Sequence, residues 1–563
     1  MTGLARNPVV PGCHPDPSIC RVGADYYLIT STFEYFPGLP IHRSRDLVNW
    51  QLIGHVLDRP GQLPLDGVRP SGGLFAPTLR HAGGVSYVVC TLVDGAAESG
   101  NFVVTAPHPT GPWSDPAWLD DVPGIDPSLF FDDDGRAWLL GSRPIAGAEL
   151  AGRTEIWMRE FDPARLRVTG PEHVLFSGAL VDAAWVEGPH LFRREGYYYL
   201  LLSEGGTEHN HAVTVARSTR VTGPYRNNPA NPVLTHRHLG RVQPIVATGH
   251  ADLVQTPAGD WHAVLLAMRP YGGYFCNLGR ETFLAAVAWE DGWPIINPGA
   301  GRLLAEFPAP LPPHPWPPEP PVDDFDATTL APVWNILRTP REKFFSLTDR
   351  PGHLRLRLRA EVVTQPSNPS FVGRRQQHMS FAASTAMDFE PAAANECAGL
   401  VLLRDTSHQI RLVVTLAQRP DGGPPAEAGP VHAAPVKGGP VQAVPGEGGP
   451  VQAAPVNGGP VKVARVVLCR DGADEIVAEA PLPAGRIYLA AEAAGQDYTL
   501  RWAQDPARWQ TLATVDGRVL SPAAVGDFTG AYLGMYASAH GQSSANAADF
   551  DWFEYSGRDQ DLA

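Results

Sequence analysis

Short apolar runs separated by turns follow one another along most of the chain. In the first half, five segments share one plan, a turn carrying glycine and then an aromatic or β-branched run: 21–30, 80–89, 131–140, 193–202 and 257–266. Each segment is typical of a β-hairpin. The turn glycines lie about 50 to 60 residues apart, which is room for four short strands. The repeat therefore predicts a five-bladed β-propeller, whose radial arrangement protects the edges of its sheets.

The second half predicts strands in a different arrangement. Residues 354–359 read Leu-Arg-Leu-Arg-Leu-Arg, an alternation with period two that is typical of a half-buried strand. Further apolar runs begin at Gly399, Ile410, Val466 and Ala531. An antiparallel β-sandwich packs such strands face to face. The predicted fold class is therefore all-β, a five-bladed β-propeller followed by an antiparallel β-sandwich.

Two stretches of biased composition divide the chain. Residues 308–321 contain nine prolines in fourteen positions, which excludes a helix or a central strand and indicates a stiff linker. The predicted domains are a propeller over 1–307, a proline-rich linker over 308–321 and a β-sandwich over 322–563. A ten-residue repeat at about 429–462 has too few bulky residues to fold by itself. We interpret it as an insertion in a surface hairpin, with a binding arm as the alternative.

Composition narrows the class of protein. Gly and Pro number 57 each in 563 residues, which favours short strands over long helices. A net charge of −15 argues against a nucleic-acid partner, because phosphate binding needs clustered Lys and Arg. We find no apolar run long enough for a membrane span and no apolar signal-peptide core at the start, so no membrane partner and a cytoplasmic location are expected. The six cysteines form no Cys-x-x-Cys pair, so neither a zinc site nor a disulfide framework is expected.

Four ionisable residues open the strands that precede the five turns. Asp16, Asp126, Glu187 and His250 stand seven to nine residues before the turn glycine, and Ala76 has this place in the second unit. Equivalent positions of propeller blades point to the same end of the central axis. We therefore expect three carboxylates and a histidine to converge there. The structural alternative is that Asp-Pro simply starts a turn.

Converging carboxylates suit the hydrolysis of glycosidic bonds. One carboxylic acid with a raised pKa protonates the leaving oxygen, while an ionised one activates water or attacks carbon. A third carboxylate nearby raises the pKa of the acid. The run Asp132–Asp134 lies at a hairpin tip and is interpreted as a solvated turn. Seven aromatic residues near these motifs could provide apolar faces for sugar rings: Phe33, Tyr35, Phe36, Phe75, Trp185, Tyr271 and Tyr274.

Several longer motifs resemble glycoside hydrolase family 43. They occupy residues 7–18 (Asn-Pro-Val-Val-Pro-Gly-Cys-His-Pro-Asp-Pro-Ser), 31–38, 42–50, 125–130 and 187–190. The motifs at 279–284 and 289–299 resemble its β-xylosidase branch, and those at 334–338 and 346–356 resemble the C-terminal β-sandwich of that branch. The resemblance covers nearly the whole chain apart from the repeat at 429–462.

The resemblance implies an inverting, exo-acting β-1,4-xylosidase that releases xylose from the non-reducing end of short xylo-oligosaccharides. Asp16 matches the general base and Glu187 the general acid. Asp126 matches the carboxylate that orients the acid and tunes its pKa. Arg280 matches an arginine that hydrogen-bonds the terminal xylose, and its planar fork suits paired hydroxyls. His250 matches a histidine beneath the active site.

Three aromatic residues complete the substrate-binding set that the resemblance implies. Phe33 and Phe75 match walls of the sugar pocket, although many relatives carry tryptophan in place of Phe75. Phe528 matches an aromatic residue that the sandwich sends to the rim of the active site. The alternative is that Phe528 belongs to the core of the sandwich.

Other interpretations stay open at this point. Xylose and arabinofuranose present similar hydroxyl patterns, so the enzyme could have α-L-arabinofuranosidase activity as a side activity or as its primary one. A third interpretation is a propeller that binds sugar without catalysis. The sandwich is interpreted as a structural partner rather than as an independent carbohydrate-binding module. No cofactor is expected to be required, and the sequence shows no metal-ligand cluster. Some relatives nevertheless bind a divalent ion such as calcium near the histidine that matches His250, and relatives form dimers or tetramers, which predicts a homo-oligomer.

Overall fold

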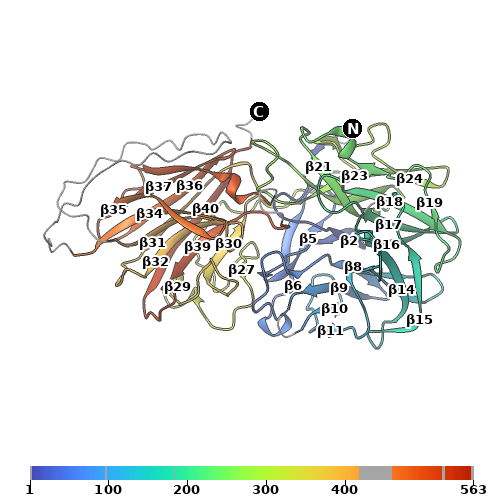
Figure 1. Ribbon diagram of the computed structural model, residues 1–563, viewed down its shortest axis with the longest axis horizontal. Helices are drawn as coiled ribbons and strands as arrows, with labels where there is room; N and C mark the ends of the chain where they lie inside the picture. Colours follow the sequence, from blue (N-terminus) through green and yellow to red (C-terminus); the bar gives the residue numbers. More distant parts are fainter. Residues whose placement is uncertain (1–2, 96–97, 183, 418–458, 523–526, 560–563) are drawn as a thin grey trace.

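The computed structural model describes residues 3–95, 98–182, 184–417, 459–522 and 527–559. Within these ranges strands dominate, and three short 3-10 helices are present: η1 (Pro60–Gln62), η2 (Arg237–Leu239) and η3 (Gly517–Leu520). No helix in the described ranges is both long and apolar enough for a membrane crossing. Two bodies of β-sheet lie side by side (Figure 1), as predicted for an all-β chain.

Five antiparallel sheets make up the first body, and we call them blades 1 to 5. Blade 1 contains β2 (Ser18–Val22), β3 (Asp25–Ile29), β5 (Gly38–Ser44) and β6 (Gln51–Leu57). Blade 2 contains β7 (Gly73–Leu74), β8 (Thr78–Ala82), β9 (Val85–Val93), β10 (Gly100–Ala106) and β11 (Ala117–Trp118). Blade 3 contains β12 (Ile125–Phe131), β13 (Ala137–Pro144), β14 (Thr154–Asp162) and β15 (Arg167–Phe176).

The last two blades repeat this plan. Blade 4 contains β16 (Glu187–Arg194), β17 (Tyr197–Glu204), β18 (Ala212–Ser218), β19 (Arg226–Asn227) and β20 (Leu234–Thr235). Blade 5 contains β21 (Val246–Gln255), β22 (Trp261–Met268), β23 (Glu281–Glu290) and β24 (Trp293–Ile296). In blades 1, 3, 4 and 5 the turn glycine of the repeat lies between the first two strands of the blade. In blade 2 it lies between β8 and β9, which follow the short β7.

The five blades stand in a closed ring. Their first long strands contact one another in turn, β2 with β8, β8 with β12, β12 with β16, β16 with β21, and β21 with β2 again. One buried apolar cluster fills each space between neighbouring blades. In β3, Tyr26 packs toward blade 5 and Tyr27 toward blade 2, because successive side chains of a strand point to opposite faces. Each blade therefore stabilises both of its neighbours.

Polar side chains from the first strands of all five blades meet along the axis of this ring, and we call them the axial cluster: Ser18, Arg80, Ser128, His190 and Asp252. Asp252 Oδ2 accepts hydrogen bonds from Ser18 Oγ and Arg80 Nη1, each at 2.8 Å. His190 Nδ1 lies 2.9 Å from Arg80 Nη2 and 3.2 Å from Ser128 Oγ. The axial cluster thus links every blade to the others.

The electrostatics of the axial cluster are those of a buried ion pair. Burial lowers the pKa of His190 to about 3, so its ring is neutral and accepts from arginine. Burial by itself would raise the pKa of Asp252, but the charge of Arg80 and its hydrogen bond to the carboxylate outweigh that effect and lower it. The Asp252 carboxylate is therefore ionised in the interior, where its pairing with Arg80 offsets the cost of desolvation.

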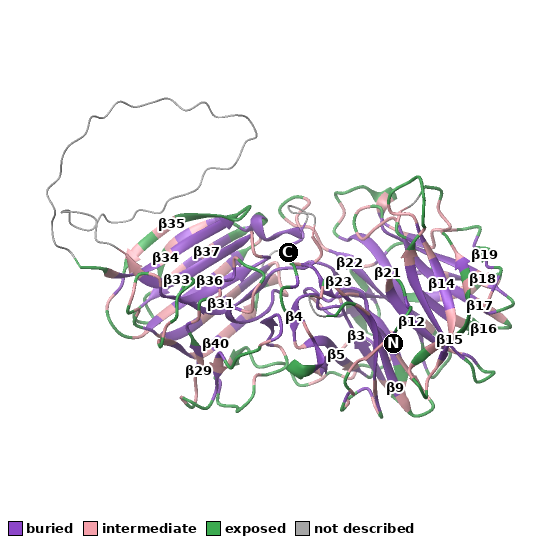
Figure 2. Ribbon diagram, turned by 60° about the horizontal axis from the view of Figure 1, so that its bottom comes forward, coloured by how far each residue is buried: buried purple, intermediate pink, exposed green. Residues whose placement is uncertain are grey.

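The second body consists of two antiparallel sheets. One follows the order β28 (Phe345–Ser346), β29 (Leu354–Arg357), β40 (Ala547–Gly557), β31 (Ser380–Asp388), β36 (Ile487–Ala494), β37 (Asp497–Ala503) and β38 (Gln510–Asp516), and β26 (Val322–Asp323) also pairs with β40. The other follows the order β30 (Ser370–Arg375), β39 (Tyr532–Ser538), β32 (Cys397–Leu403), β33 (Gln409–Ala417), β34 (Val461–Arg470) and β35 (Ala473–Pro481). Side chains of both sheets form one apolar core, which confirms the predicted sandwich (Figure 2).

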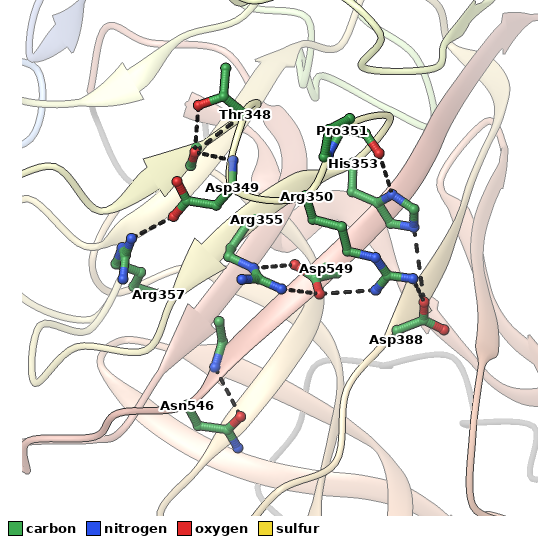
Figure 3. A network of polar contacts seen from close by, with 12 residues as sticks. Thr348, Asp349, Arg350, Pro351, His353, Arg355, Arg357, Asp388, Asn546 and Asp549 are labelled. Carbon is green, nitrogen blue, oxygen red and sulfur yellow. Dashed lines mark hydrogen bonds and ion pairs between the residues drawn. The ribbon is translucent and has the colours of Figure 1, made fainter.

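Ion pairs fasten strand β29 to its neighbours in the sandwich (Figure 3). Arg355 donates two hydrogen bonds, of 2.7 and 2.8 Å, to Asp549 of β40. Arg350 bridges Asp549 at 2.9 Å and Asp388 of β31 at 2.7 Å. On the opposite face, Leu354 and Leu356 are buried in the core. The alternation predicted for residues 354–359 therefore divides charged from apolar side chains along β29, as expected.

The two bodies are joined by backbone pairing. Strand β4 (Tyr35–Phe36) of the first pairs with β27 (Ile336–Leu337) of the second. Arg375 Nε also donates to the carbonyl of Cys13 at 2.7 Å. Residues 309–320, within the predicted linker, lie outside strands and helices. They follow β25 (Glu306–Pro308), which pairs with β1 (Leu4–Arg6).

The predicted insertion at about 429–462 lies almost entirely outside the described residues. Its last two residues, Val461 and Lys462, belong to strand β34, which pairs with β33. The two flanking strands that the sequence predicts are therefore present. The exact domain limits stay a prediction.

Removing the central carboxylate should destabilise the ring. We expect Asp252→Ala to lower the free energy of unfolding by about 3–5 kcal/mol, because it leaves the guanidinium of Arg80 buried without its partner. Asp134→Ala is the matched control, since it breaks an Asp–Arg pair that lies on the surface, and it should cause no measurable change. Urea denaturation of the variants measures both effects. Equal stability of the two variants would contradict a central role for the pair.

Candidate active site

A shared backbone conformation places the ionisable residues at one end of the axis. Asp16, Asp126 and His250 have positive φ angles of 54°, 55° and 48°, and Gly188 has one of 57°. In blades 3, 4 and 5 the pairing register shifts at this point, and such bulges redirect side chains next to active sites. A left-handed conformation costs a non-glycine residue about 1–3 kcal/mol. In blade 4 glycine takes this position, so Glu187 lies one residue earlier than its counterparts.

Asp16 lies at the centre of the site. Its Oδ1 accepts a hydrogen bond from Arg280 Nη1 at 2.9 Å, and its Oδ2 accepts one from Ser31 Oγ at 2.6 Å. His250 Nδ1 lies 3.7 Å from the same Oδ1. Burial by itself would raise the pKa of Asp16, but Arg280, His250 and the Ser31 hydroxyl outweigh that effect and lower it. Asp16 is therefore ionised at neutral pH and can accept a proton.

Glu187 has the opposite electrostatic state. Its side chain is half-buried, and burial followed by the charges of Asp126 and Asp16 raises its pKa well above the usual range. Burial also raises the pKa of Asp126, with His250 opposing the rise and Asp16 adding to it. Asp126 Oδ2 accepts a hydrogen bond from the backbone N–H of Gly188 at 3.0 Å, which fixes the chain beside Glu187. The site therefore holds one carboxyl group poised to accept a proton and one poised to donate it.

His250 packs beneath these groups. It is buried, and its backbone N–H donates to Ser203 Oγ at 2.6 Å. A Cβ built on Gly188 would lie 3.1 Å from Cε1 of the His250 ring, so a larger residue at position 188 would displace the histidine. This contact explains why blade 4 carries glycine where blades 1 and 3 carry aspartate.

The expectation of a calcium ion near His250 meets no matching ligand set. Calcium takes about six to eight oxygen ligands. The described part of the chain contains no group of three or more His, Cys, Asp or Glu residues arranged to hold a metal ion. Asp16, Gly188 and Ser203 contact His250, and Asp126 and His211 also lie near it, so a calcium ion at this place stays a prediction.

Three phenylalanine rings pack together beside Arg280, and two of them contact its guanidinium. Phe33 lies 5.8 Å from Phe75 and 6.2 Å from Phe528 between ring centroids, and Phe75 lies 6.2 Å from Phe528. Arg280 Cζ is 5.5 Å from the centroid of Phe33 and 5.4 Å from that of Phe528. The three rings and Arg280 thus form an apolar wall beside Asp16, a surface suited to the apolar face of a sugar ring.

Phe528 reaches this wall from the sandwich. Its backbone N–H donates to Ser71 Oγ at 3.2 Å, and the next residue, Thr529, accepts a hydrogen bond from Arg404 Nη1 at 2.5 Å. Arg404 is fully buried at the end of β32, and its Nη2 also lies 3.4 Å from Asp527 Oδ2. The structure therefore places Phe528 against the first body and not in the sandwich core, which was the alternative.

The other predicted aromatic residues have different places. Tyr35 stacks on Tyr532 at 3.8 Å between the two bodies, and Phe36 belongs to the core between blades 1 and 2. Tyr271 and Tyr274 contact Gln376 and Arg241, respectively. Trp185 is exposed at 46% of its surface.

The acidic run at the hairpin tip of blade 3 is less solvated than predicted. Asp132 is buried, and its Oδ2 accepts a hydrogen bond from Tyr198 Oη at 2.8 Å while Arg193 Nη1 binds its Oδ1 at 3.2 Å. Asp134, in contrast, is exposed, as predicted. Arg193 Nη1 also lies 2.8 Å from Asp133 Oδ2, so two residues of the run bind blade 3 to blade 4.

Two family models match the chain. The model "Glycosyl hydrolases family 43" matches residues 5–294. The model "Beta xylosidase C-terminal Concanavalin A-like domain" matches residues 322–425 and 456–556, so it leaves out most of the ten-residue repeat. The chain belongs to glycoside hydrolase family 43.

The similarity to known members of family 43 extends over nearly the whole chain. A Butyrivibrio fibrisolvens protein named "Xylosidase/arabinosidase" is 40% identical over 98% of this chain and 99% of its own. A Bacteroides ovatus protein named "Non-reducing end alpha-L-arabinofuranosidase BoGH43B" is also 40% identical, over 98% of this chain and 94% of its own. A crystal structure of "xylan beta-1,4-xylosidase" from Bacillus halodurans has a TM-score of 0.85 and 37% identity, over 98% of this chain and 99% of its own. The protein is thus a glycoside hydrolase.

Several residues of this family 43 site escape reasoning from sequence. Ser31 begins the motif at residues 31–38, but that motif does not indicate its hydrogen bond to Asp16. Thr207, whose Oγ1 accepts from Arg280 Nη1 at 3.0 Å, follows β17 without any motif. Arg404 lies 125 residues from Thr529 along the chain, and only the folded sandwich brings them together.

Shortening Phe528 should weaken the pocket without loosening the fold. We expect Phe528→Ala to raise KM about tenfold, equivalent to about 1.4 kcal/mol, with little change in Tm. Phe553→Ala is the control, since Phe553 lies in the sandwich core and its truncation should cost about 3–5 kcal/mol of stability. Kinetics and thermal melts of both variants provide the test. A Tm loss for Phe528→Ala as large as that of the control, with normal kinetics, would count against a place in the pocket.

Proposed function

We propose that this enzyme is an inverting, exo-acting β-1,4-xylosidase that releases xylose from the non-reducing end of short xylo-oligosaccharides. The observation that carries this proposal is the unequal environment of two neighbouring carboxyl groups. Asp16 is hydrogen-bonded to Arg280 and its pKa is lowered, whereas the pKa of Glu187 is raised well above its usual range. An ionised base and a protonated acid are what single-step hydrolysis of a glycosidic bond needs. The names of the relatives support xylose as the sugar.

In the proposed reaction, Asp16 and Glu187 act on opposite sides of the bond. Asp16 takes a proton from a water molecule as the water oxygen forms a bond to the anomeric carbon. The bond from that carbon to the leaving oxygen breaks, and this oxygen receives the proton of Glu187. Asp126 holds the backbone beside Glu187 and, by its charge, keeps the acid protonated. Arg280 binds sugar hydroxyls while it also orients Asp16.

The wall of three phenylalanines supports exo action on one terminal sugar. Phe528 approaches Phe33 and Phe75 from the sandwich, so the pocket has a side that the blades alone do not provide. Exclusion of water from such a pocket strengthens the electrostatic effects among its carboxyl groups.

A primary α-L-arabinofuranosidase is the second candidate. The Bacteroides ovatus relative with that name is as similar to this chain as the Butyrivibrio fibrisolvens relative named for both activities. Parallel measurements of kcat/KM on 4-nitrophenyl β-xyloside and 4-nitrophenyl α-L-arabinofuranoside test the proposal, which requires the xyloside to be the better substrate. NMR of the first anomer released from xylobiose tests inversion, for which α-xylose is the expected product. The homo-oligomeric state and cytoplasmic location remain predictions.

Glu187→Gln should affect substrates according to their leaving group. On xylobiose we expect kcat to fall by about 10²–10⁴, because the sugar alkoxide needs a proton to leave. On 4-nitrophenyl xyloside the loss should be much smaller, because nitrophenolate leaves without one. Asp16→Asn is the control and should reduce both rates to a similar extent. Equal losses on the two substrates for Glu187→Gln would contradict its role as the acid.

Asp126→Asn should shift the pH profile in a defined direction. Removal of a negative neighbour lowers the pKa of Glu187, so Glu187 loses its proton at a lower pH. The basic limb of kcat/KM should therefore move to lower pH. Asp132→Asn, which removes a buried carboxylate outside the pocket, should leave that limb in place. An unchanged basic limb in Asp126→Asn would reject the proposed role.

A further inference from the structure

An indole ring stands exposed two residues before Glu187. Trp185 exposes 46% of its surface, whereas Trp138 and Trp157 of the neighbouring blade are buried. The exposed position is nevertheless held in place. The backbone N–H of Trp185 donates to the carbonyl of Gly152 at 2.7 Å, and its φ of 57° lies in the left-handed region. Such strain at a non-glycine residue is typical of functional sites.

The indole rests on the backbone of two glycines. A Cβ built on Gly152 would lie 3.1 Å from Trp185 Cε2, and one built on Gly206 would lie 3.2 Å from Trp185 Cδ1. Side chains at these two positions would push the indole away. Residue 184 is fixed as well, because its carbonyl accepts a hydrogen bond from the N–H of Gly205 at 2.7 Å. The part of the indole that these contacts leave uncovered forms a supported apolar surface.

This surface adjoins the pocket through two separate routes. Along the chain, Glu187 follows Trp185 by two residues. Through space, Gly206 supports the indole, and the next residue, Thr207, accepts a hydrogen bond from Arg280 Nη1 at 3.0 Å. The same nitrogen binds Asp16 Oδ1 at 2.9 Å. Trp185 therefore lies near the pocket, two residues from Glu187 along the chain and next to the segment that contacts Arg280.

We propose that Trp185 is the binding platform for the leaving-group sugar, the unit on the far side of the scissile bond from the terminal xylose. This inference rests on the proposed function, in which Glu187 protonates the leaving oxygen. The group attached to that oxygen must extend past Glu187, and the exposed indole of Trp185 offers it an apolar surface. Aromatic rings that are rigid before binding lose little conformational entropy on contact with a ligand. The chemical class of ligand is a neutral pyranose ring, stacked through its C–H face.

Two substrates that share the terminal sugar separate this role from others. Xylobiose has a xylose leaving group, whereas β-xylosyl fluoride has a single atom that cannot reach the indole. We expect Trp185→Ala to lower kcat/KM on xylobiose about tenfold, equivalent to about 1.4 kcal/mol, and to leave hydrolysis of the fluoride within about twofold. Trp185→Phe keeps a flat ring and should recover most of the xylobiose activity. It also guards against a folding defect in the alanine variant.

Trp118→Ala is the matched control. Trp118 is half-buried on β11, the outermost strand of blade 2, and packs on Phe102 at 5.2 Å, so its loss should change neither substrate. Provided that the wild type hydrolyses both compounds, two results for Trp185→Ala would overturn the proposal. One is an equal loss of kcat/KM on both substrates, and the other is no loss on xylobiose. If the wild type hydrolyses neither, the proposed function fails and this inference fails with it.

Discussion

The buried pair of Arg80 and Asp252 is the interaction on which the arrangement of the active site depends. Each blade of the ring presents a polar group to the axis, and the Asp252 carboxylate with the Arg80 guanidinium connects them. Three members of this axial cluster, Ser18, Ser128 and Asp252, each follow a site residue by two positions. Only one residue separates each site residue from its neighbour in the cluster, so the contacts that hold the cluster also hold the backbone beside the site. Stability and function are therefore linked through the same strands.

The chemistry of the site comes from an unequal distribution of charge among similar groups. Asp16, Asp126 and Glu187 are all carboxyl groups close enough to influence one another, and three negative charges together would be unfavourable. Arg280 touches Asp16 directly, which stabilises the ionised form of that residue. Glu187 has no comparable cation in contact among the described interactions and keeps its proton instead. Because Arg280 contacts Asp16 and not Glu187 in the described interactions, Asp16 serves as the base and Glu187 as the acid.

The sequence repeat locates the carboxyl groups because a blade is a local unit. Asp16 lies two residues before β2, Asp126 lies at the start of β12 and His250 lies within β21. The distance to the following turn glycine is nevertheless enough to find all three. Glu187 was found by the same count, but its exact place depends on Gly188, whose missing side chain leaves room for the His250 ring.

Thr207 and Arg404 could not be found in this way. Their partners lie 73 and 125 residues away along the chain, and no local pattern encodes such contacts. Asp132 was misjudged for a related reason, since its partner Tyr198 comes from the next blade.

The position of Phe528 decides between the two interpretations of the sandwich. An independent carbohydrate-binding module needs only a surface of its own, and its removal would leave the catalytic pocket complete. In this protein the sandwich supplies the third ring of the aromatic wall, and Arg404 holds the segment from behind through Thr529. The opposite side of that segment is held by the first body, where Ser71 accepts from the backbone of Phe528. A pocket wall fastened from both bodies cannot keep its geometry if they separate. The backbone pairing of β4 with β27 therefore supports catalysis indirectly, because it holds the two bodies in the relative position that brings Phe528 against the other two rings.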